Sequence, residues 1–331
     1  MKKYSTTFRS LLFLLLFSLC CFGYTKTVSA SSVSKNGQLQ VKGGKIVNKS
    51  GKPFVIKGIS THGLSWYPQY VNKKAFQSLK KRGVNTIRLA MYTEEYNGYC
   101  TGDAANRKKL EALIDKGVSY ATDLGMYAII DWHVLSDGNP LKHKSEAKTF
   151  FKKTAKKYSN HNNVIFEICN EPNGYDGSWK NIRSYANSII KTIRSVNKKA
   201  IIIVGTPTWS QEILQAADKP LKGNNIVYAF HFYASTHTDN MRNTLKAAMK
   251  RKLPVIVSEF GLSEASGSGK VNLKQAAKWI NLLNHYKIGR VCWSLSNKNE
   301  TSALIKASCS KVSGWKDSDL TKAGKWLFKH Y

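Results

Sequence analysis

Eight short apolar runs rich in β-branched residues alternate along the chain with longer amphipathic segments. Each run has the length of one buried strand, and each amphipathic segment has the period of a helix that packs one face against a core. The strand candidates are residues 54–60, 85–92, 126–133, 164–170, 200–206, 226–233, 254–259 and 289–294. Eight strand-and-helix units in a chain of 331 residues predict an α/β fold of the (β/α)8 (TIM) barrel type.

The helical patterns fall between and after these runs. They cover residues 73–82, 107–124, 145–158, 180–196, 211–217, 240–250 and 273–286, with a closing helix at 319–329. Residues 38–48 alternate in polarity around Gly43 and Gly44, which predicts a short N-terminal β-hairpin that caps the bottom of the barrel.

The first 30 residues have the composition of a secretory signal peptide. Lys2, Lys3 and Arg9 form a basic start, residues 11–21 are apolar, and residues 28–30 read Val-Ser-Ala, a small-residue cleavage site. An uncleaved anchor is the rival interpretation, but the apolar stretch is shorter than the roughly 20 residues that cross a bilayer. We therefore expect a secreted protein with no transmembrane segment after cleavage.

A lipid anchor at the leader is a second alternative, because Cys20 and Cys21 lie within it. It is disfavoured, since no small residue directly precedes Cys20. Beyond the leader we expect a short extension at 31–37 and a single (β/α)8 domain at 38–331, because no linker-like composition interrupts that stretch.

The formal net charge of +32 arises from 52 basic and 20 acidic residues. Many lysines occur in runs such as 73–74, 80–82 and 156–157, on the outward faces of predicted helices. Two interpretations stay open: a solvated face that keeps a secreted protein soluble, or a surface with affinity for polyanions such as an anionic cell wall. Nucleic-acid binding is not expected, because no aromatic residues interleave the basic runs.

Four cysteines follow the leader, and none forms a CxxC pair. Cys169 and Cys292 fall inside apolar runs and are expected in the core, while a disulfide between Cys100 and Cys309 stays open. No Asp-rich loop or His/Cys cluster has the spacing of a metal site. We expect no metal and no cofactor, and we expect a monomer.

Two acidic tetrads end two of the apolar runs: Asn170-Glu171-Pro172-Asn173 and Ser258-Glu259-Phe260-Gly261. Side chains at the carboxyl ends of barrel strands share one mouth. Because side chains alternate along a strand, we expect Glu259 to lie on the same face as Val255 and Val257. Two carboxyl groups in one cleft can break glycosidic bonds.

The two glutamates need opposite protonation states for that reaction. We expect Glu171 to be the acid and later the general base, its pKa raised to roughly 6–7 by burial and by the second carboxylate. Glu259 is the expected nucleophile, kept ionised by Arg88 and hydrogen-bonded by Tyr233. Further polar residues late in their strands are candidates for binding sugar hydroxyls or Glu171: Asn170, His133 and His231.

Aromatic rings supply the other half of sugar recognition, because the apolar face of a pyranose stacks on an indole. Trp66, Trp209 and Trp293 lie at or just past the ends of predicted strands and are expected in the cleft. The remaining tryptophans are expected in packing positions: Trp132, Trp179, Trp279, Trp315 and Trp326.

Seven segments have the character of family motifs. They are residues 62–67 (HGLSWY), 85–92 (NTIRLAMY), 131–133 (DWH), 168–172 (ICNEP), 231–233 (HFY), 258–261 (SEFG) and 293–298 (WSLSNK). In this order they resemble glycoside hydrolase family 5, and within it most closely the bacterial endo-β-1,4-glucanases. The similarity extends from about residue 38 to the C-terminus.

The resemblance implies a retaining mechanism with Glu171 as acid/base and Glu259 as nucleophile. It also implies that six residues surround the cleaved sugar: Arg88, His133, Asn170, His231, Tyr233 and Trp293. Sugars on the non-reducing side would contact His62, Trp66, Tyr92, Lys298 and Glu300. Tyr67 lies in the same motif as Trp66 and is included among the substrate-binding residues, and Trp209 would bind on the leaving-group side.

The sequence thus predicts a secreted retaining endo-β-1,4-glucanase that cleaves internal bonds of soluble or amorphous cellulose. An alternative keeps the mechanism but replaces cellulose as the substrate by another β-1,4-glycan, namely mannan, xyloglucan or mixed-linkage glucan. An alternative of another class is a non-catalytic wall or polyanion binder, although such a binder has no need for two strand-end carboxyl groups with opposed protonation.

Overall fold

The computed structural model describes residues 32–331. The predicted signal peptide lies outside the described residues. Within them, no helix is both long and apolar enough to span a membrane. The four cysteines of this part of the chain are free, so the disulfide left open between Cys100 and Cys309 is not formed.

Eight parallel strands close into a barrel in the order β10-β3-β4-β5-β6-β7-β8-β9. The strands are β3 (Lys57–Thr61), β4 (Thr86–Tyr92), β5 (Tyr127–His133), β6 (Val164–Glu167), β7 (Ile202–Val204), β8 (Ile226–Tyr233), β9 (Val255–Gly261) and β10 (Arg290–Leu295). All eight predicted strands are present, so the predicted (β/α)8 barrel is confirmed.

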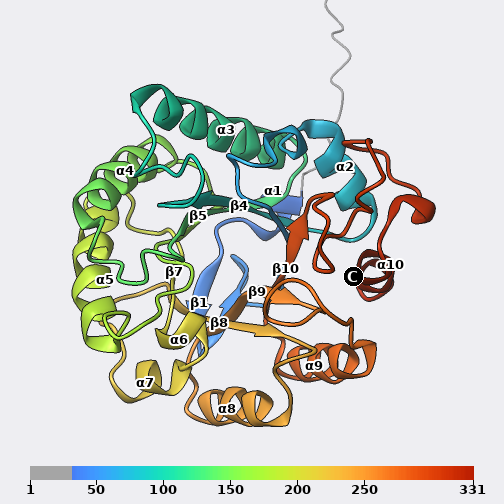
Figure 1. Cartoon of the computed structure of the whole chain (residues 1–331). Helices are drawn as coiled ribbons and strands as arrows, with labels where there is room; N and C mark the ends of the chain where they lie inside the picture. The colour runs from blue at the N-terminus through green and yellow to red at the C-terminus, as the bar shows by residue number, and fades with distance from the viewer. Residues whose placement is uncertain (1–31) are drawn as a thin grey trace, which may run out of the picture. The chain divides into compact units, whose positions relative to one another are not determined.

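Helices surround the barrel (Figure 1). They are α2 (Lys73–Lys81), α3 (Ala104–Asp123), α4 (Lys144–Lys157), α5 (Trp179–Arg194), α6 (Pro207–Ser210), α7 (Ile213–Asp218), α8 (Asp239–Lys250), α9 (Leu273–Tyr286) and α10 (Lys322–Lys329), with short 3-10 turns η1 (Pro68–Tyr70) and η2 (Asp317–Asp319). Five of them begin at a side-chain cap that accepts the backbone N–H three residues on: Asn72, Asp103, Ser178, Asn272 and Thr321.

The bottom of the barrel is closed by the N-terminal part of the described chain. The hairpin of β1 (Gln40–Lys42) and β2 (Lys45–Val47) brings Leu39 and Ile46 onto the barrel's inner apolar cluster. The backbone N–H of Val41 donates to Asn225 Oδ1 at 2.9 Å, just before β8. The predicted hairpin cap is therefore confirmed, and the segment predicted as an extension contains a short helix, α1 (Ser32–Asn36).

Strand β9 carries an irregularity that the alternation rule missed. Its pairing with β8 passes from Ala229↔Ile256 to His231↔Glu259, so β9 has one extra residue there, and its pairing with β10 shifts over the same stretch. Val255 and Val257 consequently pack outward in the cluster beneath the helices, whereas Glu259 lines the mouth. The prediction that these three share one face is wrong, because a β-bulge resets the alternation.

Two other boundaries differ from prediction near the mouth. Strand β6 ends at Glu167, so Asn170 and Glu171 lie in the segment beyond it rather than in the strand. The helix predicted at 211–217 is observed as α7, which begins at Ile213, and a separate short turn, α6, precedes it from Pro207 to Ser210. Beyond Glu167 the segment that carries Asn170 and Glu171 is therefore no longer part of the regular strand pairing.

Candidate active site

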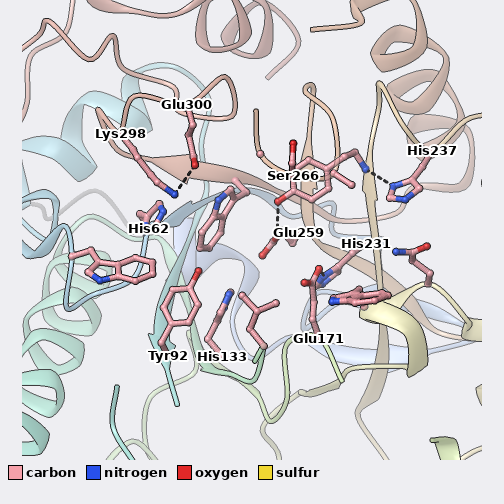
Figure 2. Close-up of a pocket in the computed structure, with 18 residues that line it drawn as sticks. His62, Tyr92, His133, Glu171, His231, His237, Glu259, Ser266, Lys298 and Glu300 are labelled. Carbon is pink, nitrogen blue, oxygen red and sulfur yellow. Dashed lines mark hydrogen bonds and ion pairs between the residues drawn. The ribbon is translucent and has the colours of Figure 1, made fainter. Parts of the chain in front are cut away.

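A cleft of about 560 Å³ opens at the carboxyl ends of the barrel strands (Figure 2). Its lining is His62, Trp66, Tyr92, His133, Leu135, Glu171, Trp209, Gln211, His231, Tyr233, His237, Glu259, Ala265, Ser266, Gly267, Trp293, Lys298 and Glu300. The cleft has the location that active sites take in barrels of this type.

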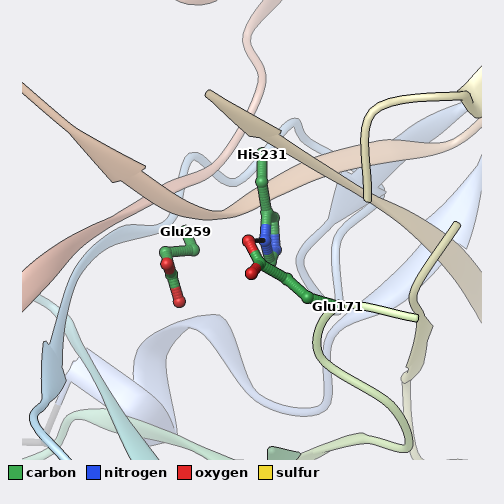
Figure 3. A group of neighbouring side chains, drawn as sticks. All are labelled: Glu171, His231 and Glu259. Atoms are coloured by element: carbon green, nitrogen blue, oxygen red, sulfur yellow. Dashed lines mark hydrogen bonds and ion pairs between the residues drawn. The ribbon is translucent and has the colours of Figure 1, made fainter. Parts of the chain in front are cut away.

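Glu171 and Glu259 approach each other at the centre of this cleft (Figure 3). One carboxylate oxygen of each, together with a ring nitrogen of His231, lie within 4.8 Å of one another. Retaining glycosidases hold their two carboxyl groups about 5–5.5 Å apart, whereas inverting enzymes leave roughly 6.5–9.5 Å for a water molecule. The spacing observed here is the short one.

Arg88 lies below the two glutamates and is fully buried. Its guanidinium donates to Glu167 Oε2 at 2.7 Å and to Glu259 Oε2 at 3.1 Å, and it lies 3.0 Å from Asp131 Oδ2. A buried cation of this kind is stable only when carboxylates and hydrogen bonds surround it. The predicted partnership of Arg88 with Glu259 is confirmed, and the same cation also binds the interior carboxylates.

The two catalytic candidates differ in the donors they receive. Glu259 Oε1 accepts the phenolic hydrogen of Tyr233 at 2.7 Å, and its Oε2 accepts from Arg88. Within residues 32–331 Glu171 contacts no cation, and its side-chain partner is His231 Nδ1 at 2.8 Å. When the pair shares one proton, Glu171 is therefore the better place for it.

Electrostatics favour the same assignment. Burial raises the pKa of Glu171 to about 8, with Arg88 opposing and Asp131 and Glu167 adding to the rise. The pKa of Glu259 is also raised, first by burial and then by Glu171, while Arg88 and the two neighbouring histidines oppose the shift. The pKa of Glu171 is therefore raised, as expected from the sequence, and its value of about 8 is somewhat higher than the roughly 6–7 expected there.

A chain of hydrogen bonds fixes where the proton of Glu171 points. The hydroxyl of Ser258 donates to Glu167 Oε1 at 2.6 Å, so its oxygen accepts from His231 Nε2 at 2.9 Å. Burial lowers the pKa of His231 to about 4, so its ring is neutral and Nδ1 carries only a lone pair. Nδ1 must then accept a hydrogen from Glu171 Oε1, which requires a protonated Glu171.

His133 and Asn170 form a second buried group on the other side of Arg88. His133 Nδ1 lies 2.6 Å from Asp131 Oδ2, and burial lowers the pKa of His133 to about 3. Asn170 Oδ1 accepts from Arg88 at 2.6 Å, and its amide nitrogen contacts His133 Nε2 and the Val134 carbonyl, each at 3.2 Å. A sugar hydroxyl that bonded to Asn170 would have to replace one of these contacts.

Aromatic rings form a wall on one side of the glutamates. The ring of His62 lies 5.2 Å from that of Trp66 and 5.0 Å from that of Trp293. Above this wall Lys298 forms an ion pair with Glu300 at 2.6 Å, and Lys298 Nζ lies 6.0 Å from the Trp66 ring centre. In Figure 2 the labelled residues His62, Lys298 and Glu300 lie to one side of the pair, and His237 lies to the other.

Most predicted site residues line the cleft, and three do not. Arg88 and Asn170 lie beneath it, fully buried. Tyr67 packs behind His62, with ring centres 5.0 Å apart. The predicted cleft tryptophans Trp66, Trp209 and Trp293 all line the cleft.

Several lining residues were not found from the sequence: Leu135, Gln211, His237, Ala265, Ser266 and Gly267. His237 follows the end of β8 by four residues and Gln211 follows Trp209 by two, so their closeness to strand ends was an available signal. The 265–267 loop carries no sequence signal of its own, because its position depends on how the segment after β9 folds back.

Glu171, His231 and Glu259 are also a set of ligand atoms that could hold a metal ion. Two features compete with a cation at this place. The Glu171 oxygen shares a proton with His231, and the guanidinium of Arg88 already lies 3.1 Å from Glu259. The donor set therefore fits proton chemistry better than resident metal binding.

The family model described as Cellulase (glycosyl hydrolase family 5) matches residues 47–299. The chain is 46% identical over 293 residues to Endoglucanase A of Butyrivibrio fibrisolvens, covering 88% of this chain and 68% of that protein. It is 44% identical to an endoglucanase of Clostridium saccharobutylicum, covering 92% of this chain and 67% of that protein. The chain thus spans about two thirds of the length of these relatives.

Solved structures give the same picture of the fold. The catalytic domain of a Thermobifida fusca endoglucanase superposes with a TM-score of 0.85 at 34% identity, covering 90% of this chain and 98% of that one. A structure described as the catalytic domain of alkaline cellulase K superposes with a TM-score of 0.83 at 30% identity, covering 90% and 94%.

Proposed function

The chain belongs to glycosyl hydrolase family 5, and we propose that it is a secreted endo-β-1,4-glucanase that cleaves internal bonds of soluble or amorphous cellulose by double displacement. Family membership makes it a retaining glycoside hydrolase of the endoglucanase type. The observation that carries the proposal is the short separation of the Glu171 and Glu259 oxygens, within 4.8 Å.

In the first step Glu259 attacks the anomeric carbon while Glu171 gives its proton to the departing glycosidic oxygen. The C–O bond to the leaving sugar breaks, and an ester between the sugar and Glu259 forms. Arg88 and Tyr233 keep Glu259 charged and aligned before the attack, through contacts of 3.1 and 2.7 Å. Loss of negative charge from Glu259 in this step weakens both contacts and leaves the ester ready to break.

In the second step Glu171, now ionised, takes a proton from water, and the hydroxyl attacks the anomeric carbon from the face that the leaving group left. His231 accepts a hydrogen bond from protonated Glu171 at Nδ1. Because Ser258 fixes the tautomer of His231 through Nε2, the ring holds Glu171 in place whenever Glu171 carries its proton, before the first step and again after the second. Two inversions return the original anomeric configuration.

Glucan is the proposed substrate class because the curated relatives are named endoglucanases. A Thermobifida fusca endoglucanase domain, 34% identical to this chain, was solved in complex with cellotetraose. The wall of Trp66, Trp293 and His62 would bind glucose units on the non-reducing side, and Trp209 would bind the leaving group. The contact proposed between Asn170 and a 2-hydroxyl requires exchange of one of its present hydrogen bonds.

The test is hydrolysis of carboxymethylcellulose by the wild type and by Glu171→Gln and Glu259→Gln, with Asp176→Asn as control because its carboxylate is exposed. Both cleft variants should lose essentially all activity, and the control should keep it. NMR of the first products should detect the β-anomer. Full activity in either cleft variant would overturn the proposal.

Specificity among related polymers is tested separately. Initial rates on purified β-1,4-glucan, mixed-linkage glucan, mannan and xyloglucan should be highest on β-1,4-glucan. A preference for pure mannan would keep the mechanism and change the substrate class. The predicted leader is tested by mass analysis of protein recovered from the medium of the producing cell, which should begin near Ser31.

An electrostatic association with an anionic cell wall is proposed as well, through a groove of about 570 Å³ between α4 and α5. Lys148, Lys152 and Lys191 line this groove, and its lining contains no carboxylate. On the opposite side of α4, Lys153 and Lys157 pair with acids of α3 at 2.6 and 2.5 Å. The three groove lysines thus have no carboxylate beside them in the lining of the groove.

Charge reversal of the three groove lysines should reduce retention on anionic wall polymer and weaken its dependence on salt. The matched control reverses three exposed lysines that lie outside the groove: Lys116, Lys222 and Lys274. An equal loss in both variants would mean that overall charge, rather than the groove, governs retention. Hydrolysis of soluble substrate should be unchanged in either.

A further inference from the structure

We propose that the short turn α6, Pro207–Ser210, is the positioning element of the general acid, acting through the carbonyl groups on either side of Glu171. This inference rests on the role proposed for Glu171. The Ser210 hydroxyl donates to the Asn170 carbonyl at 2.6 Å. The backbone N–H of Trp209 donates to the Pro172 carbonyl at 3.1 Å. The residues before and after Glu171 are therefore both tied to one turn.

Glu171 needs such support because it lies outside the strand ladder. Strand β6 ends at Glu167, four residues earlier. On one side, the backbone N–H groups of Asn170 and Glu171 donate to the carbonyls of Trp132 and Val134, each at 3.1 Å. The turn supplies the opposite side. The acid is held between the extension of β5 and α6.

The segment leading into the turn comes unusually close to the acid's backbone. A Cβ built on Gly205 would meet the Cys169 carbonyl oxygen, and it would lie 2.9 Å from the Asn170 oxygen and 2.8 Å from Pro172 Cδ. Glycine is therefore the residue that lets β7 reach this position. The contact between the two segments is direct backbone packing as well as hydrogen bonding.

The turn itself has an unusual backbone. Thr208, Trp209 and Ser210 have φ of 56°, 53° and 58°, a left-handed conformation that residues with a Cβ seldom adopt. Such conformations persist where surrounding contacts fix them, and they are common at functional sites. Here Ser210 Oγ also accepts from the Thr206 N–H at 3.2 Å, so one buried hydroxyl closes the turn and binds the acid's backbone.

The same turn presents Trp209 to the leaving-group side of the cleft, where the residue is 45% exposed. The element that would contact the departing sugar is thus the one that holds the group that protonates it. Ser210 does not touch substrate; it acts through the Asn170 peptide. Its loss should misplace the Glu171 carboxyl without changing Glu259.

The test uses aryl β-cellobiosides with graded leaving groups, comparing wild type with Ser210→Ala. Only poor leaving groups need a proton from Glu171, and kcat/KM reports the glycosylation step. Since small misplacement of a reacting group can slow a reaction by about 100-fold, kcat/KM for phenyl cellobioside should fall roughly 10- to 100-fold. For 2,4-dinitrophenyl cellobioside it should stay within about threefold of wild type.

Ser210→Gly is the second variant, because glycine favours the positive φ of this position and removes the same hydroxyl. The control is Thr206→Val, which removes a neighbouring buried hydroxyl that donates to the Ala229 carbonyl at 3.2 Å rather than to the acid's segment. It should lower kcat/KM equally for all leaving groups, or not at all.

An equal loss for good and poor leaving groups in both Ser210 variants would overturn the positioning role, because a structural defect lowers all rates alike. Unchanged rates would overturn it too. If the wild type hydrolyses none of the cellobiosides or cellulose derivatives, the proposed function fails instead, and the two failures are distinguishable.

Discussion

Replacement of Glu171 by glutamine should make the protein more stable at neutral pH while removing its activity. The pKa of Glu171 is raised by burial from 4.5 to about 8. Between these values the unfolded chain has released the proton and the folded chain still binds it, so stability falls as pH rises. Glutamine never ionises in either state. Its amide can still donate to His231 Nδ1, as the protonated carboxyl does.

The size of the effect follows from the linkage between proton binding and folding. Each pH unit between the two pKa values corresponds to about 1.4 kcal/mol. At pH 7 the limit is therefore roughly 3 kcal/mol, and coupling with Glu259 makes about 1–3 kcal/mol the expected range. For a domain of this size that is a rise in Tm of roughly 2–6 °C.

Differential scanning calorimetry of wild type and Glu171→Gln at pH 7 and at pH 4 measures this directly. Near pH 4 both folded and unfolded wild type bind the proton, so the advantage of glutamine should vanish. Asp176→Asn is the control and should leave the difference in Tm near zero at both values, because its carboxylate is exposed. The reasoning is refuted if Glu171→Gln is no more stable than wild type at pH 7, or if its advantage is equally large at pH 4.

Three further outcomes follow from the site. Arg88→Met should lower the free energy of unfolding by about 3–5 kcal/mol, measured in urea, because it leaves Asp131, Glu167 and Glu259 without their buried cation; an unchanged midpoint would contradict this. The same change should raise the pKa of Glu259 and so shift the acidic limb of the pH profile of kcat/KM to higher pH. In the wild type the basic limb should fall at about pH 8, where Glu171 loses its proton. An acidic limb that does not move in Arg88→Met would count against the assignment of Glu259. Dialysis against EDTA should leave the rate of carboxymethylcellulose hydrolysis unchanged, and loss of activity restored by a divalent cation would show that Glu171, His231 and Glu259 hold a metal.

The sequence predicted what depends on regular periodicity. The eight strands and the order of the helices follow from hydrophobic periodicity, and the positions of Glu259 and His231 late in their strands follow from the rule that barrel chemistry lies at carboxyl ends. The partnership of Arg88 with Glu259 could also be predicted, because opposite charges that point into the same barrel must pair when buried.

What the sequence could not predict depends on departures from that periodicity. The bulge in β9 turns both Ser258 and Glu259 toward the barrel mouth, against strict alternation. The hydrogen-bond chain from Glu167 through Ser258 to His231 joins three strands, and nothing in the local sequence marks it.

The turn at Pro207–Ser210 is a similar case. Its left-handed residues are threonine, tryptophan and serine rather than glycine. No local preference predicts such a turn, so contacts with the segment around Glu171 must determine it. Tyr67 is a different case: its place in a sugar-binding motif predicts contact with substrate, and in the structure its ring packs 5.0 Å from that of His62 without lining the cleft.

In the proposed mechanism Glu259 forms a covalent bond to the sugar, and Glu171 first donates a proton and then accepts one. Incubation with 2,4-dinitrophenyl 2-deoxy-2-fluoro-β-cellobioside, followed by peptide mass spectrometry, tests it most directly, because the fluorine slows breakdown of the glycosyl ester. One fluorocellobiosyl group should be added to the peptide that contains Glu259. A label on Glu171, or rapid hydrolysis with inverted product and no label, would contradict it.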